Sequence, residues 1–480
     1  MALDKVVDST ILDGYFSDIA NAIRRKNGES GTYTPAQMPQ KINDIPSGGG
    51  AVERKDVNFI DYDGTIVYSF TTAEFLALSE MPENPTHAGL TSQGWNWSLT
   101  DAHNYVDSYM KLTIGQMYIT DDGKTRVYIT LPEGRTEPYI GYYLSGTAVI
   151  DWGDGNTDNV TGGGVNTLKY IQHQYSNSGD YVITIDITGT FKFAGYNSSY
   201  ILMKDRNTLN DNSYPGCVTK IELGSNISLA NKAFRALKSL ESITIPSYIT
   251  SMGSDQFTGC YLLKSVTIPN GITYIGNWSF STCYALESVS LPKGLTKIPD
   301  YMFRNCYGLK WLDIPDGVTE IYNDSFSSCC ALESVTIPNN VTSFGSNVFN
   351  SASSLKSVII PDSVSTGIGT YFFSNCVNLF SCSLSNNMTV LQNGFFNGCV
   401  SLCKITIPAS ITSINNSSLS ACRSLAEIHF KSATPPSVAN SNAFSELPSD
   451  CKIYVPTGSL SAYTSATNYP SSSTYTYIEE

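Results

Sequence analysis

The sequence predicts a mixed fold with three parts: a small N-terminal helical segment, a β-sandwich, and a β-rich solenoid of 23-residue coils that ends in a cap. Three observations predict these parts. Residues 1–45 contain two short patterns with helical spacing, residues 123–205 alternate polar and apolar residues as strands do, and residues 206–456 repeat one pattern every 23 positions.

Composition excludes several classes of protein. The 480-residue chain is 41% hydrophobic with a mean hydropathy of −0.10, which excludes full-length disorder. Only 15% of residues are charged and the net charge is −13, so we expect neither nucleic acid nor an anionic membrane as a partner. No run of about 18 apolar residues predicts a membrane span. The first residues show no secretory signal, so we expect a chain made in the cytosol.

Two short helices are expected at the N-terminus. Apolar residues recur four apart at Ile11, Tyr15, Ile19 and Ile23, and a second helix follows T-P-A-Q, which supplies an N-cap, a proline at N1 and a glutamine at N3. A helical pair this small rarely folds alone, so we expect it to pack on a partner. The sequence P-S-G-G-G at 46–50 is the predicted flexible linker.

Two N-terminal stretches resemble phage proteins. The helical segment, in AIRRKNGESGTYTPAQMPQKI, is similar to the N-terminal segment of many tail and minor structural proteins of phages infecting Firmicutes. Residues 51–122 include DYDGTIVYSFTTAEFLALSEMPENPTHAGLTSQGWNWSLTDAHNYV, which resembles a module of predicted tail proteins and prophage-encoded repeat proteins of gut Clostridia. The resemblance implies that residues 1–50 dock on tail or baseplate proteins and that residues 51–122 form an α+β module.

Residues 123–205 are the predicted sandwich. Arg126–Leu131 and Tyr181–Ile187 alternate as strands, with V-I-D-W-G-D-G and later H-Q-Y and G-D-Y around them. These motifs resemble the polycystic-kidney-disease-type (PKD-like) β-sandwich. The resemblance implies a spacer or carbohydrate-proximal module without catalytic activity.

The repeat itself has four fixed positions in each coil, proline, phenylalanine, cysteine and leucine. The prolines are Pro246, Pro269, Pro292, Pro315, Pro338 and Pro361, then Pro408. The phenylalanines are Phe257, Phe280, Phe303, Phe326, Phe349, Phe373 and Phe396. The cysteines are Cys260, Cys283, Cys306, Cys329, Cys376, Cys399 and Cys422, each followed three residues later by leucine. One extra residue enters near Thr366 and shifts the later positions.

A coil of 23 residues cannot bury its apolar face alone, so successive coils must stack and form continuous inner columns. This predicts a leucine-rich-repeat solenoid. The unit I-T-x-I-x-x-x-x-F-x-x-C-x-x-L-x-x-V-x-I-P resembles the bacterial leucine-rich repeats of the BspA-like type. The resemblance implies that a last strand, Cys451–Val455, closes the stack, with residues 457–480 as a C-terminal cap or tail. The cysteines are predicted to be free thiols that fill the core, because Ala352 replaces one of them and no C-x-x-C pair occurs.

Catalytic motifs are weak. Phe59–Thr65 matches the D-x-D-G-T strand end of haloacid-dehalogenase-type phosphatases through Asp61 and Asp63, and Asp154 with Asp158 imitates the later acidic pair of that family. The required alternation of strands and helices is missing, so we interpret the first motif as a turn. Four histidines without zinc-ligand spacing predict no metal site. We therefore expect no catalytic residues, no cofactor and no enzyme.

Candidate binding residues lie on the outer surface of the solenoid. The residues flanking the valine of L-x-x-V-x-I should point outward and form a sheet of hydroxyl groups from Ser265 and Thr267 to Glu427 and His429. Trp311 beside Asp313 interrupts these hydroxyls and suits a sugar ring, unless it only covers a neighbouring coil. A second outward row, Tyr261, Tyr284 and Tyr307, either contacts a ligand or packs between coils.

Three functions stay open. The first is a phage or prophage tail receptor-binding protein, made in the host cytoplasm and located in the virion tail, whose solenoid recognises a host cell-surface glycan or protein. Its N-terminal helices could also hold a homo-oligomer together, such as a trimer. The second is an adhesin of the same repeat family on the bacterial cell surface that binds host glycoprotein or matrix, although neither a signal sequence nor an L-P-x-T-G anchor is visible. The third is a phosphatase or glycan hydrolase.

Overall fold

The computed structural model describes residues 56–109, 111–134, 137–194, 217–365 and 367–480. The chain divides into two units, Met1–Asp56 and Val57–Glu480. The two helices predicted within residues 1–45 and the linker at 46–50 lie outside the described residues. Within the described part of the chain, no helix is both long and apolar enough to cross a membrane.

A small α/β module begins the second unit. Its sheet has the order β2-β1-β4-β3 and consists of β1 (Val57–Ile60), β2 (Ile66–Phe70), β3 (Leu90–Trp95) and β4 (Leu112–Thr120). The helices are α3 (Thr72–Leu76), which a Thr71–Glu74 capping box begins, and α4 (Leu99–Tyr109). Phe59, Phe75, Trp95 and Ile114 form the core between helices and sheet. Nearly every residue of β4 is buried, because both faces of this strand are covered.

A seven-stranded sheet follows. Its path is β11-β10-β5-β9-β6-β7, and β8 pairs with β6. The strands are β5 (Thr125–Leu131), β6 (Tyr139–Asp151), β7 (Thr157–Thr161), β8 (Gly164–Gln172), β9 (Gly179–Phe193), β10 (Val218–Glu222) and β11 (Ser242–Thr244). Because β10 pairs with both β5 and β11, this sheet runs without a break into the first coil of the solenoid.

The long strands β6 and β9 bend where two glycines face each other. Gly146 pairs with Gly189, and both have a positive φ, of 100° and 114°. A Cβ on either would overlap a backbone carbonyl of the opposite strand, so only glycine fits this bend. Beyond the bend, Trp152 is fully buried, stacks on His173 at 4.7 Å and donates its indole N–H to Asp158 at 2.8 Å. The W-G-D-G turn and the H-Q-Y segment therefore pack against each other through Trp152 and His173.

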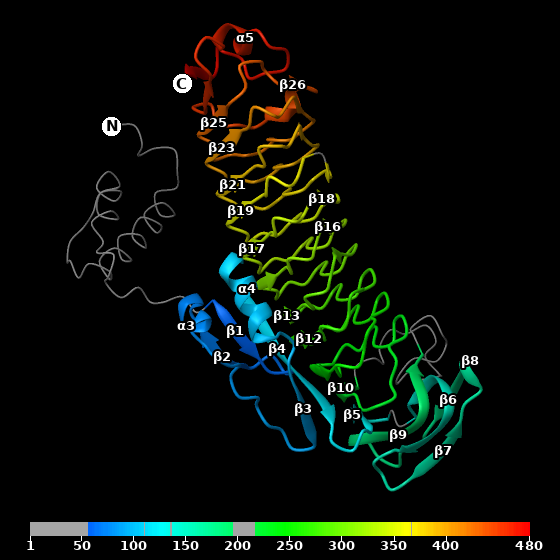
Figure 1. The fold of residues 1–480 in the computed structure, drawn as a ribbon. Coiled ribbons are helices and arrows are strands. Elements are labelled where there is room, and N and C mark those ends of the chain that lie inside the picture. Colours follow the sequence, from blue (N-terminus) through cyan, green and yellow to red (C-terminus); the bar gives the residue numbers. More distant parts are fainter. Residues whose placement is uncertain (1–55, 110, 135–136, 195–216, 366) are drawn as a thin grey trace, which may run out of the picture. The chain divides into compact units, whose positions relative to one another are not determined.

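The solenoid carries two stacks of short parallel strands (Figure 1). After β11 the first stack continues with β12 (Ser265–Thr267), β13 (Ser288–Ser290), β15 (Trp311–Asp313), β17 (Ser334–Thr336), β19 (Ser357–Ile359), β21 (Ser381–Ser383), β23 (Lys404–Ile407) and β25 (Glu427–Phe430). The second stack contains β14 (Lys297–Ile298), β16 (Glu320–Ile321), β18 (Ser343–Phe344), β20 (Gly367–Ile368), β22 (Val390–Leu391), β24 (Ser413–Ile414) and β26 (Ser437–Val438). The predicted solenoid of 23-residue coils is confirmed.

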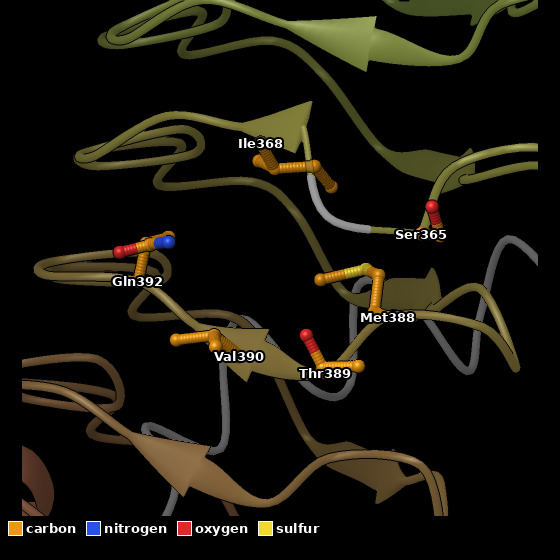
Figure 2. Close-up of a pocket in the computed structure, with 6 residues that line it drawn as sticks. All are labelled: Ser365, Ile368, Met388, Thr389, Val390 and Gln392. Carbon is orange, nitrogen blue, oxygen red and sulfur yellow. The ribbon is translucent and has the colours of Figure 1, made fainter.

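The second stack is interrupted between β20 and β22, which do not pair, one strand after the extra residue near Thr366. Figure 2 shows the hollow at this break, which Ser365, Ile368, Met388 and Gln392 border. It has space of only about 10 Å³, enough for about one water molecule. The hollow is therefore a packing irregularity and no ligand site.

The inner columns hold the coils together. Phenylalanine rings of successive coils stack with centroids 5.4 to 5.7 Å apart from Phe234 to Phe396, so the column begins one coil earlier than the sequence predicted. The cysteines do more than fill space. Cys283 Sγ donates to the carbonyl oxygen of Phe257 at 3.2 Å, and the other cysteines of the column make the same bond to the preceding coil. All twelve cysteines are free thiols.

The C-terminal cap corrects one prediction. The last strand is β28 (Thr476–Glu479), which pairs in parallel with β27 (Lys452–Val455), so the stack extends one strand beyond the predicted end. The 3-10 helix η2 (Ser441–Phe444) precedes β27, and the helix α5 (Leu460–Thr464) lies between β27 and β28. The segment after β27 lacks the repeat pattern, and only the alternation of T-Y-T-Y-I-E marks the strand.

Candidate functional site

Two columns of side chains point outward from the first strand stack. The first outer column is Ser242, Ser265, Ser288, Trp311, Ser334, Ser357, Ser381, Lys404 and Glu427. The second outer column is Thr244, Thr267, Ser290, Asp313, Thr336, Ile359, Ser383, Thr406 and His429. Both follow from the alternation of side chains along a strand, and together they form the surface that the sequence predicted as a hydroxyl sheet.

The α/β module covers the beginning of both columns. Strand β4 contacts β11, β12, β13 and β15. Figure 1 shows the module lying beside these coils. Ser265, Thr267, Ser288 and Ser290 are consequently buried. The prediction that these residues form an exposed surface is wrong, because another part of the same chain occupies it.

Hydroxyl groups of the outer columns form hydrogen bonds with the module, both with its backbone carbonyls and with the side-chain amide of Asn96. Ser290 Oγ donates to the carbonyl oxygen of Thr113 at 2.9 Å, and Asn96 Nδ2 donates to Ser290 Oγ at 2.7 Å. Asn96 Oδ1 in turn accepts from the amide of Gly115 at 2.8 Å. Since these groups are buried, each bond replaces one that water would otherwise make.

Further contacts fix both ends of this interface. Tyr105 of α4 donates its hydroxyl to the carbonyl oxygen of Ile314 at 2.8 Å, and Lys111 Nζ lies 3.3 Å from Ser334 Oγ. Asp101 forms an ion pair with Lys293, and this hydrogen bond holds the pKa of the aspartate below its usual range. The module thus reaches from the first coil to β17.

Trp311 does not have the exposure that the sequence predicted. Its side chain is half-buried in β15, which β4 contacts, and its Nε1 is buried without a hydrogen-bond partner among the described residues. Asp313 is half-buried on the same strand. An indole with a buried N–H can offer only part of its ring to a ligand.

The tyrosine row is a regular stack. Ring centroids lie 4.7 Å apart between Tyr261 and Tyr284 and 5.0 Å apart between Tyr284 and Tyr307, with interplanar angles of 12° and 7°. Lys238 Nζ lies 5.9 Å from the ring centroid of Tyr261. Tyr284 is 39% exposed and Tyr307 46% exposed. The stack therefore presents ring edges and hydroxyl groups, whereas neighbouring rings cover most of the ring faces.

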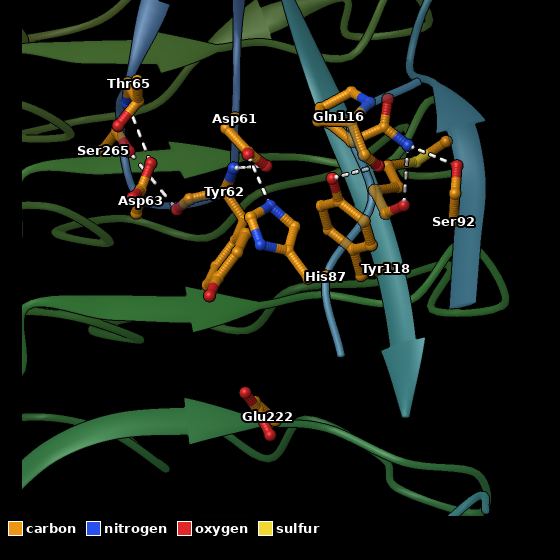
Figure 3. A network of polar contacts seen from close by, with 12 residues as sticks. Asp61, Tyr62, Asp63, Thr65, His87, Ser92, Gln116, Tyr118, Glu222 and Ser265 are labelled. Carbon is orange, nitrogen blue, oxygen red and sulfur yellow. Dashed lines mark hydrogen bonds and ion pairs between the residues drawn. The ribbon is translucent and has the colours of Figure 1, made fainter. Parts of the chain in front are cut away.

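The phosphatase-like motif lies in a hairpin turn between β1 and β2. The amide of Gly64 donates to the carbonyl oxygen of Asp61 at 3.0 Å, as the interpretation of the motif as a turn requires. Figure 3 shows the buried Asp61 facing His87, with Nε2 and Oδ2 2.6 Å apart. Burial raises the pKa of the neighbouring Tyr118. The exposed Asp63 bonds instead to the amide of Thr65 at 2.9 Å, so the two aspartates point to different partners.

The second acidic pair also serves the local fold. Asp154 Oδ2 lies 2.8 Å from His173 Nε2, which helps to keep the aspartate pKa low, and Asp158 accepts from Trp152. No group of three or more histidine, cysteine or carboxylate side chains suited to a metal ion occurs among the described residues.

Two exposed apolar residues lie on the later coils. The sequence placed Ile359 among the outward-pointing residues, whereas sequence reasoning missed Phe380. Ile359 in the second outer column is 72% exposed, and Phe380, directly before β21, is 52% exposed. Their signal was present in the sequence, since most coils carry serine or threonine in the place of Ile359 and the earlier coils carry lysine or glutamate in the place of Phe380.

Comparison with known proteins agrees with this architecture. The BspA type leucine rich repeat region, a pattern of six copies, matches residues 207–330 and 319–450, which together are about half of the chain. No curated protein sequence matches the chain.

Several solved structures are similar in fold. A leucine-rich repeat protein from Bacteroides ovatus is 22% identical over 64% of this chain and 90% of its own, with a TM-score of 0.36. The leucine rich repeat protein of T. pallidum is 26% identical over 37% of this chain and 78% of its own, with a TM-score of 0.29. A leucine rich cell surface protein from Faecalibacterium prausnitzii is 23% identical over 59% and 94%, also with a TM-score of 0.29.

Proposed function

The chain belongs to the BspA type leucine-rich repeat family, and from this premise we propose that it is a non-catalytic binding protein whose solenoid recognises a glycan or protein on the surface of a host cell. A repeat fold does not by itself identify the ligand that a protein binds, so the proposal must be argued from a particular surface of the molecule. Among the described residues, the tyrosine stack is the surface that supports it.

The tyrosine stack carries the proposal because it is exposed and already ordered. Each of the three rings is held by stacking on a neighbour 4.7 or 5.0 Å away, so little side-chain entropy remains to be lost on binding. The hydroxyl groups of Tyr284 and Tyr307 can donate to and accept from sugar hydroxyls or peptide groups. Trp311 and Asp313, which are half-buried, would extend this surface only as minor contacts.

The biological setting that we propose is a phage or prophage tail. In this setting residues 1–50 dock on tail or baseplate proteins, residues 123–205 form a PKD-like spacer and the solenoid contacts the host. The resemblance of residues 9 to about 120 to phage tail proteins supports this setting. The alternative is a bacterial cell-surface adhesin of the same family that binds host glycoprotein or matrix.

Binding of the full chain to Firmicute cells and to a glycan array tests the proposed recognition. We expect saturable binding that Tyr284→Ala or Tyr307→Ala weakens by about tenfold. The matched control is Tyr274→Ala, because Tyr274 is 62% exposed but lies outside the stack. Equal binding by all variants would remove the stack as the recognition surface.

Assembly of particles tests the proposed setting separately. Deletion of residues 1–50 should abolish incorporation into virions while the solenoid stays folded. Particles that retain the truncated chain would contradict the tail setting and favour the cell-surface adhesin.

A further inference from the structure

Both outer columns are exposed on three successive coils within the described part of the chain. We call this surface the open strand window, and it consists of Ser357, Ile359, Ser381, Ser383, Lys404 and Thr406, all of them exposed. On one side it ends at Ser334, which contacts Lys111 of the module. On the other side it ends at His429, which is buried between Glu427 and Glu480. The window is thus a bounded part of a surface that the chain covers elsewhere.

The covered coils show what these columns bind. Ser290 donates to a backbone carbonyl of β4, and Ser265 Oγ lies 3.4 Å from the carbonyl oxygen of Tyr62. The columns therefore accept polypeptide backbone, with serine hydroxyls as donors to carbonyl oxygens. Ser381 and Ser383 occupy the same two column positions in the window, where both residues are exposed.

Apolar and charged groups in the window and beside it are arranged as in a protein interface. Ile359 in the window is 72% exposed, and Phe380, which directly precedes Ser381 at the edge of the window, is 52% exposed. The neighbouring lysines are neutralised within the solenoid, since Lys356 pairs with Glu333 at 2.7 Å and Lys404 pairs with Glu427 at 3.0 Å. An apolar and hydroxyl-rich centre with charged groups at its border is typical of protein–protein contacts. Isoleucine offers a sugar no hydrogen bond, so a glycan fits this surface less well.

We propose that the open strand window is a docking site for an extended segment of a partner protein. This segment lies across the exposed coils in the way that β4 lies across the covered coils. Serine and threonine hydroxyls of the window donate to carbonyl oxygens of this segment. Ile359 and Phe380 contact its apolar side chains. This site is distinct from the tyrosine stack and does not depend on the function proposed above.

A peptide copied from the module tests the proposal, because the columns already bind its sequence within the chain. The probe is the capped peptide of residues 111–121, KLTIGQMYITD, with a photoreactive diazirine analogue of methionine at the position of Met117. Irradiation with the full chain, at peptide concentrations up to about 1 mM, is followed by mapping of the cross-links by mass spectrometry. We expect saturable labelling within residues 357–406.

The variants replace the two apolar residues with the residues that other coils carry at the same positions. Ile359→Thr copies Thr267 and Phe380→Lys copies Lys356, so neither should disturb the fold, and together they should reduce labelling by about tenfold. Leu262→Ser is the matched control, since Leu262 is an exposed apolar residue outside the window. Three outcomes would overturn the proposal. Labelling could equal that of a scrambled peptide, it could persist in the double variant, or it could map to residues 242–313. Loss of glycan binding in the double variant would overturn it too, because the window would then hold a glycan.

Discussion

Gly115 in β4 lies directly against Thr267 in β12, and a Cβ added at Gly115 would come within 2.9 Å of the Thr267 Cβ. The hydroxyl and methyl groups of this threonine would be closer still. Strand β4 can rest on the solenoid only because residue 115 has no side chain. The contact between module and solenoid is therefore specified by one position that the repeat pattern does not include.

Gly115→Ala should weaken this contact. The added methyl group has no space, so we expect the free energy of opening of β4 to fall by about 1–3 kcal/mol, measured by hydrogen exchange of the β4 amides. Thr267→Ala in the same chain should recover part of the loss, since it removes the closest atoms and a buried hydroxyl that has no hydrogen-bond partner among the described residues. Gly271→Ala is the control, because its Cβ would meet no atom closer than 3.6 Å. Unchanged β4 exchange in Gly115→Ala would contradict the contact.

A pair of serines in one column distinguishes covered from open coils. Ser290 is buried and bonds to Thr113 and Asn96, whereas Ser383 is exposed. Ser290→Ala should cost about 1–3 kcal/mol because it leaves buried polar groups without a partner. Ser383→Ala, the same change in the same column, should stay within about 0.5 kcal/mol. Denaturant unfolding and exchange of the β4 amides measure both, and equal effects would show that β4 does not cover Ser290.

The repeat made the solenoid predictable, but not its surface. Columns such as Phe257 to Phe396 follow from a period of 23 residues, because only inward positions must stay apolar in every coil. The sequence does not distinguish a serine whose hydroxyl donates a hydrogen bond to water from one whose hydroxyl donates to a backbone carbonyl. Whether Ser290 is covered is decided by β4, a segment outside the repeat.

One local signal did point to the covered surface. Gly115 is an isolated glycine in L-T-I-G-Q-M-Y-I-T, the sequence of β4, and such a glycine within a strand indicates a bulge or the close approach of another backbone. It could have indicated that β4 packs closely on something. It could not have identified Thr267 as the neighbour, since that pairing depends on tertiary structure.

Thiol reactivity should separate the inner cysteines from Cys403. Burial raises the pKa of the column thiols, for Cys422 to about 12, and their sulfur atoms have no access to solvent. Iodoacetamide should therefore modify Cys403, which is exposed, at least about 100-fold faster than Cys283 or Cys306 in the native protein. Mass spectrometry of partly alkylated protein measures the order. Cys403→Ser should remove the fast phase, and rapid modification of the column cysteines would contradict their burial.

The last strand should loosen in acid. Glu480, directly after β28, accepts from Lys431 Nζ at 2.5 Å and lies 2.9 Å from His429 Nδ1. The bond to Lys431, followed by that to His429, keeps the pKa of Glu480 below its usual value, and the bonds to His429 and Lys404 do the same for Glu427.

A carboxylate whose pKa is lower in the folded state stabilises that state above its usual pKa, and the contribution disappears as the pH falls through the lowered value. Amides of residues 476–479 should consequently lose exchange protection below about pH 4, relative to their own protection at pH 6. Glu480→Gln should lower this protection already at pH 6 and make it nearly independent of pH, because the glutamine cannot be titrated. Equal protection of β28 at pH 6 and pH 3 in the unmodified chain would contradict the role of these ion pairs.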